Sequence, residues 1–189
     1  MRHVLLAAAL LTVAGCDSTD SLLGEFESQI AVEGQSTRFV EGEALYTVVE
    51  TAEGPRFVLA LFFDDLGDND AEDYGFISFT REAGRPGVGA YSVDEDSDAP
   101  SIVAVTLAEV EDGDDPLDAT GFVMRGRTGV LSITGADPYG NLAGSFNFRA
   151  EGASVRVPAL EVAAVASGQF EAYYESPAVL RALGVELGL

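Results

Sequence analysis

The chain has 189 residues, with 32 Asp and Glu against 10 Lys and Arg, which gives a formal net charge of −22. Every cationic residue is Arg, and apolar residues make up 47% of the chain, so the composition indicates a folded protein rather than an acidic disordered tail. The shortage of cations argues against a nucleic-acid partner, because phosphate binding depends on clustered Lys and Arg.

The first sixteen residues have the pattern of an export signal. Arg2 and the free amine supply a cationic start, and an apolar run follows from Val4 to Val13. That run is too short to cross the roughly 30 Å hydrocarbon core of a bilayer as a helix. The next residues, Val13-Ala14-Gly15-Cys16, closely resemble the lipobox of bacterial lipoproteins.

This resemblance implies a lipid anchor at Cys16. In bacterial lipoproteins the Cys thiol receives a diacylglycerol, the chain is cut before the Cys, and the new amine is acylated. We therefore expect a signal peptide over 1–15, a lipidated Cys16 with a tether over 16–24, and a single β domain over 25–189. The protein would then be held to a membrane of the cell envelope by its lipid, facing the periplasm or the cell exterior. The alternative is an ordinary secretory signal that contains a Cys by chance.

Loss of the signal peptide limits the chemistry of the mature chain. The signal contains His3, the only His, and the sequence has no Lys and a single Cys. Histidine-dependent nucleophiles, His-ligated zinc and Lys Schiff bases are then excluded. We accordingly predict no catalytic residues and a protein that is not an enzyme, with a carboxylate-only hydrolase as the enzymatic alternative.

Alternating apolar and polar residues after Gly24 predict an all-β fold. We expect ten or eleven short strands in an antiparallel β-sandwich, with a closed β-barrel as the alternative. Gly126–Gly129 and Ala136–Gly140 are expected to be hairpin connections. The predicted strands are Phe26–Val32, Leu45–Val49, Phe57–Phe63, Phe76–Thr80, Ala90–Val93, Ile102–Val110, Phe122–Met124, Val130–Thr134, Leu142–Arg149, Val155–Val165 and Phe170–Tyr174.

Two further local patterns complete the predicted fold. A Gly-x-aromatic triplet recurs, and we interpret it as the start of a strand; it occurs at Gly24–Phe26, Gly89–Tyr91, Gly144–Phe146 and Gly168–Phe170. Near the end of the sequence, Ser176 as N-cap, Pro177 in the first turn and Gly184 as the stop predict one short helix.

The segments 129–134, 142–149 and 168–174 resemble the C-terminal half of a family of uncharacterised bacterial lipoproteins. The shared features are a G-x-F-x-F strand, here Gly144-Ser-Phe-Asn-Phe148, and a later G-x-F strand, here Gly168-Gln-Phe170. The resemblance implies a β-sandwich and a lipid anchor. Since that family has no agreed activity, it implies no functional residue.

Acidic residues gather in stretches between the predicted strands. Two of these stretches place an acid at every second position, as calcium-binding loops do at their start: Asp68, Asp70 and Glu72, and Asp94, Asp96 and Asp98. Both lack the Gly and the later Glu of an EF-hand, so calcium is a weak candidate and no other cofactor is predicted. The interpretation we favour is a solvated acidic surface, as in proteins adapted to high salt.

The sequence therefore predicts a non-catalytic binding or structural role in the envelope, with an envelope protein as the expected partner. A barrel that carries an apolar ligand is the second alternative. Four tyrosines could line a groove for such a ligand, although tyrosines more often cap a sheet edge with the hydroxyl in water: Tyr91, Tyr139, Tyr173 and Tyr174.

Overall fold

The computed structural model describes residues 24–63, 74–94, 102–111, 120–137, 140–154 and 161–182. Within these residues the chain forms nine strands and one short helix, so the predicted all-β class and the C-terminal helix are confirmed. The elements are β1 (Gly24–Val32), β2 (Arg38–Thr51), β3 (Gly54–Phe63), β4 (Tyr74–Arg81), β5 (Gly89–Val93), β6 (Ile102–Glu111), β7 (Thr120–Ala136), β8 (Leu142–Ser154), β9 (Glu161–Tyr174) and α1 (Pro177–Ala182).

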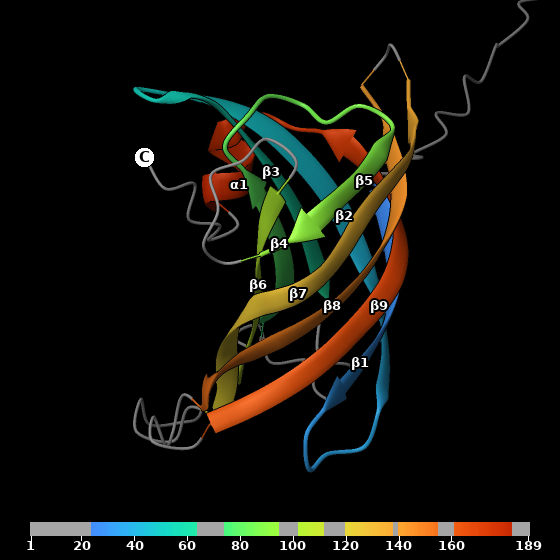
Figure 1. Cartoon of the computed structure of the whole chain (residues 1–189), viewed down its shortest axis with the longest axis vertical. Coiled ribbons are helices and arrows are strands. Elements are labelled where there is room, and N and C mark those ends of the chain that lie inside the picture. Colours follow the sequence, from blue (N-terminus) through green and yellow to red (C-terminus); the bar gives the residue numbers. More distant parts are fainter. Residues whose placement is uncertain are drawn as a thin grey trace, which may run out of the picture.

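The strands form one continuous sheet in the order β1-β2-β3-β4-β6-β5-β7-β8-β9. Antiparallel pairing of β1 with β9 closes this sheet into a barrel, the architecture given above as the alternative to a sandwich (Figure 1). Opposite walls pack against each other across one interior, much as the two sheets of a sandwich do. Because both architectures bury one face of every strand, the alternation of residues alone fits either of them.

Apolar side chains fill the interior of the barrel. Strand β1 alternates strictly, with buried Phe26 and Ile30 on the inner face and exposed glutamates on the outer face. Strand β3 is buried on both faces because α1 lies outside the barrel, where Leu180 packs against Leu45 and Val58. Among the described residues no helix has the length and apolar character needed to cross a membrane.

Reciprocal contacts between glycines and phenylalanines join β8 to β9. Gly144 lies opposite Phe170, and Gly168 lies opposite Phe146. A Cβ atom added to either glycine would lie 2.8 Å from Cζ of the ring facing it, so each ring occupies the space that the glycine leaves empty. The Gly-x-Phe triplets are therefore cross-strand packing units. Their interpretation as strand starts is wrong for Gly168, which lies within β9.

One of the two predicted hairpins is absent from the described strands. Gly126–Gly129 was expected to form a hairpin, but β7 continues through it with a register shift between Gly126 and Thr128. A bulge and a tight turn both use glycine, which explains the wrong prediction. The second hairpin is confirmed, since β7 ends at Ala136 and β8 pairs antiparallel with it from Leu142.

The barrel has two distinct ends. The entry end, at the top of Figure 1, is where β1 begins at Gly24 and where the β7–β8 hairpin and α1 lie. The far end contains the turn over 33–37, the ends of β3, β6 and β8, and the beginnings of β4, β7 and β9.

Candidate functional site

Five glutamates project from the outer surface of β1, β2 and β9. Glu25 lies directly opposite Glu43 on one side and Glu171 on the other. One step along β1, Glu27 lies opposite Glu41 and Gln169. All of these side chains are exposed, and directly opposed residues on a sheet place their Cβ atoms about 5 Å apart. We call this set the carboxylate face: Glu25, Glu27, Glu41, Glu43 and Glu171.

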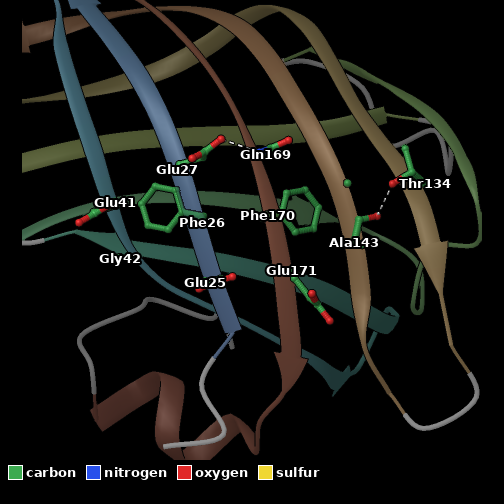
Figure 2. A pocket seen from close by; sticks show the side chains of 11 residues that line it. Glu25, Phe26, Glu27, Glu41, Gly42, Thr134, Ala143, Gln169, Phe170 and Glu171 are labelled. Carbon is green, nitrogen blue, oxygen red and sulfur yellow. Dashed lines mark hydrogen bonds between the residues drawn. The ribbon is translucent and has the colours of Figure 1, made fainter. Parts of the chain in front are cut away.

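The carboxylate face borders two surface depressions, which share Glu27, Glu41 and Gln169. Their volumes are about 720 and 700 Å³. Figure 2 shows the first, where Phe26 and Phe170 come from the same strands as the carboxylates, although both side chains are buried on the inner face of the barrel. The second includes Phe39, whose side chain is 76% exposed. The surface thus combines negative charge with an apolar group.

The arrangement favours a cationic partner that extends over several residues. Like charges placed opposite each other repel, and the described residues that line the two depressions include no Arg to offset them. One contact within the face is polar, since Gln169 Nε2 donates a hydrogen bond to Glu27 Oε1 at 2.5 Å. No group of three or more carboxylates in the described part of the chain converges closely enough to hold a metal ion.

The entry end of the barrel contains a different polar cluster, centred on Arg85 in the connection between β4 and β5. The guanidinium of Arg85 donates to the backbone oxygens of Asp137 (3.1 Å) and Asn141 (2.8 Å), on both sides of the β7–β8 hairpin. It also lies 5.5 Å from the centre of the Tyr46 ring. Tyr46 in turn donates its hydroxyl hydrogen to the backbone oxygen of Gly140. The term arginine clasp is used below for Arg85, Tyr46 and the backbone oxygens of the hairpin to which they donate hydrogen bonds.

The surroundings of Tyr46 change its acidity. Burial raises the pKa of its hydroxyl, the Coulombic effect of Arg85 lowers it, and Asp137 and Tyr174 raise it again. The net effect is a pKa above the ordinary value, so the hydroxyl remains a hydrogen-bond donor at neutral pH. The Tyr174 ring packs edge-on against Tyr46, with centroids 5.7 Å apart.

The rest of the connection between β4 and β5 is also fixed in place. Arg81 donates to the Gly84 oxygen at 2.7 Å and lies over the Tyr91 ring, 5.0 Å from its centre. The Tyr91 hydroxyl donates to the Gly87 oxygen at 2.8 Å. Tyr91 therefore holds a loop, and Tyr174 remains 52% exposed at the end of its strand.

The residues proposed from the sequence as lipid or calcium sites lie mostly outside the described residues. This holds for Cys16, Asp68, Asp70, Glu72, Asp96 and Asp98, and also for Tyr139. Asp94 is described: it is exposed, and its backbone NH donates to the Val103 oxygen at 3.2 Å. The calcium hypothesis and the lipid anchor both stay predictions.

The carboxylate face was missed in the sequence, although a signal for it was present. Glu25 and Glu27, like Glu41 and Glu43, are two residues apart, and such residues share one face of a strand. The pairing of β1 with both β2 and β9, which brings the glutamates together, depends on contacts between distant parts of the chain.

Comparison with known proteins adds no relative. No family model, no curated protein and no solved structure matches the chain. The resemblance to uncharacterised lipoproteins therefore stays an expectation, and the function has to be argued from the residues themselves.

Proposed function

We propose that the protein is a lipid-anchored lipoprotein of the bacterial cell envelope with a non-catalytic binding role. The observation that carries this proposal is the lipobox Val13-Ala14-Gly15-Cys16, which seven residues separate from Gly24, the first residue of the closed barrel. A short polar segment between a lipid attachment site and a folded domain has the form of a tether.

The carboxylate face is the binding surface in this proposal. It places five negative charges on three neighbouring strands, so a partner with several Lys or Arg side chains, such as a basic segment of another envelope protein, would relieve their mutual repulsion.

The packed interior favours this surface role over carriage of an apolar ligand. Large side chains from opposite walls meet inside the barrel, where Phe79 packs against Phe146 and Phe148 with ring centroids 5.4 and 5.8 Å apart. Both depressions described above are lined by residues of the outer wall and by the backbone beneath them.

The anchor is tested by replacing its acceptor. Cys16→Ala removes the only thiol, so the variant should lose labelled fatty acid and the cleavage typical of lipoproteins. Ser18→Ala, two residues further on, is the matched control and should retain the label. Fatty acid that still appears on Cys16→Ala protein would contradict the lipoprotein assignment.

The binding surface is tested with an oligo-lysine peptide at low salt. Replacing Glu25, Glu27 and Glu171 together by Gln should weaken its binding severalfold, because the variant loses three charges from one surface. The control replaces Glu33, Glu53 and Glu161 by Gln, which lowers the net charge equally at exposed positions outside the face. Equal weakening in both variants would show that only total charge matters and would reject the site.

A further inference from the structure

We propose that two copies of the chain associate through one outer wall of the barrel, so that the carboxylate face of each copy contacts an arginine-rich surface of the other. This inference rests on the proposed binding role of the carboxylate face, and it names a second copy of this chain as the partner. The feature behind it is the distribution of charge over the neighbouring strands β2, β1, β9, β8 and β7 (Figure 1).

Strands β7 and β8 have a charge opposite in sign to that of β1 and β9. Three Arg and one Glu are the only charged residues of β7 and β8, whereas β1 and β9 contain four Glu and no Arg. The three Arg are all exposed, and we call them the basic cluster: Arg125, Arg127 and Arg149. Glu151 lies opposite Arg125 and pairs with Arg127 at 3.6 Å and with Arg149 at 3.2 Å. Even with Asp94, directly after the neighbouring β5, cations outnumber carboxylates here.

A row of uncharged side chains separates the basic cluster from the carboxylate face. Its members lie opposite one another across the five strands, and we call them the neutral row: Phe39, Gln29, Ser167, Asn147 and Val130. The next row on one side contains Glu41 and Glu27, and the next row on the other side contains Arg149. Phe39 is 76% exposed and Val130 is 40% exposed. An uncharged centre with an exposed aromatic ring and charged surroundings is the composition of a protein–protein interface.

This arrangement is complementary to itself under a two-fold rotation. Ser167 lies on β9, the middle strand of the five, between the two charged surfaces. An axis in the plane of the wall, passing near Ser167, turns a second copy over so that its basic cluster lies on the carboxylate face of the first. The reverse contact forms at the same time, because a two-fold interface uses the same surface of both copies. Both neutral rows then meet at the centre.

The size and charge of the wall predict a weak, reversible dimer. The wall extends about 26 Å along the strands and about 19 Å across them, or about 500 Å² per copy, which is at the low end for a specific interface. The net charge of −22 also makes two copies repel each other at a distance. A Debye length of about 8 Å at physiological salt screens distant charges more than charges in contact. Tethering of both copies to one membrane raises their effective concentration.

Cross-linking of single introduced cysteines tests the contact in lipidated protein on phosphatidylcholine vesicles. Cys16 is the only natural thiol and is blocked by lipid in the proposed protein. Ser167→Cys places a thiol near the axis, so a short bismaleimide should join two copies. Ala52→Cys is the control, in an exposed turn between β2 and β3. We expect severalfold more cross-linked dimer from Ser167→Cys at about 0.15 M NaCl. Equal yields would overturn the inference.

Charge reversal in the Ser167→Cys protein tests the complementarity. One variant replaces Glu25, Glu27 and Glu171 by Arg, and the other replaces the three Arg of the basic cluster by Glu. Each variant alone should lose dimer severalfold, because like charges then meet in both contacts. A mixture of the two, one of them carrying a C-terminal tag, should recover the yield as a mixed dimer. A mixture that gives no more dimer than the separate variants would overturn the inference. The comparison of Ser167→Cys with Ala52→Cys does not depend on how these variants fold.

The oligo-lysine peptide separates failure of this inference from failure of the proposed function. The variant with the reversed basic cluster keeps the carboxylate face, so it should bind the peptide at least as tightly as wild type while it no longer dimerises. Peptide binding at the face without cross-linking through Ser167→Cys would overturn the self-association and leave the face as a binding surface. Peptide binding that does not depend on the face would overturn the proposed binding surface and, with it, this inference.

Discussion

The arginine clasp and the carboxylate face share strand β2 but differ in the partners of their charged groups. Tyr46 points inward from β2, and the cation next to it, Arg85, has two backbone oxygens and a ring as partners. Glu41 and Glu43 point outward, where cross-strand neighbours carry the same charge. A matched cation holds a structure together, whereas an array of like charges weakens it and attracts a partner. We therefore expect the clasp to contribute to stability, and the face to contribute to the proposed binding role.

Arg85→Gln is expected to have the largest effect on stability. The variant loses the charged donor of the clasp, so we expect the free energy of unfolding to fall by about 3 kcal/mol in urea denaturation. Arg149→Gln is the matched control, because Arg149 lies on the outer face with its side chain 56% exposed and pairs with Glu151 at 3.2 Å. Its loss should stay below about 1 kcal/mol. Equal losses in the two variants would mean that the clasp is no more than a surface contact.

A second variant tests the backbone beneath the carboxylate face. In Gly168→Ala the added Cβ would collide with the backbone oxygen of Glu27 and with the Phe146 ring, so we expect a loss of about 2 kcal/mol. Gly135→Ala is the control, since its Cβ would meet only the Cβ of Ala143, at 3.5 Å. Thermal unfolding of both variants checks the difference. A Gly168→Ala protein that melts like the control would show that β9 can move away from β1.

Tyr46→Phe tests the hydroxyl of the clasp. It removes one hydrogen bond, so we expect a loss of about 1 kcal/mol at neutral pH. The pKa of Tyr46 is raised in the folded protein above its unfolded value of about 10, so its contribution is complete below pH 10 and is lost as the pH rises through the folded pKa. The difference between wild type and variant should therefore shrink above pH 10 in urea denaturation. A difference that grows there would contradict the direction of the pKa shift.

The smallest expected effect is a gain in stability. Glu25→Gln removes the central charge of the row that Glu43 and Glu171 complete, so we expect an increase of about 0.5 kcal/mol at low salt. In about 1 M NaCl, where the Debye length is roughly 3 Å, the gain should disappear. Glu161→Gln is the control, because Glu161 pairs across the sheet with Ala153 rather than with another acid. An equal gain from the control would assign the effect to net charge alone.

Much of the fold could be predicted from the sequence because the alternation of residues is a local property. The inner face of β1, with Phe26 and Ile30, follows from the period of two. The beginning of β2 at Arg38 does not follow from that period. The stretch Glu41-Gly42-Glu43 contains no apolar residue of the kind that marks a strand. That part of β2 is ordered by its pairing with β1, which the local pattern does not show.

The candidate site was harder to predict for the same physical reason. The partners of Glu25 lie at sequence separations of 18 and 146 residues, at Glu43 and Glu171, so their proximity depends on closure of the barrel. The role of Arg85 was equally hidden, because it binds backbone oxygens of a hairpin more than fifty residues away. Backbone oxygens are present in every segment, so nothing in a sequence marks those that an Arg will bind.

The pairing of β1 with β9 also determines the order in which the chain can fold. Strand β1 is the first described strand to be synthesised and β9 is the last, so one edge of the β1–β2 hairpin stays unpaired until almost the whole chain is available. Exposed edges of this kind are starting points for aggregation. A chain cut before Glu161 would keep two open edges, at β1 and at β8. Under the proposed export across a membrane, closure as the last step means that folding is completed only after nearly the whole chain has crossed.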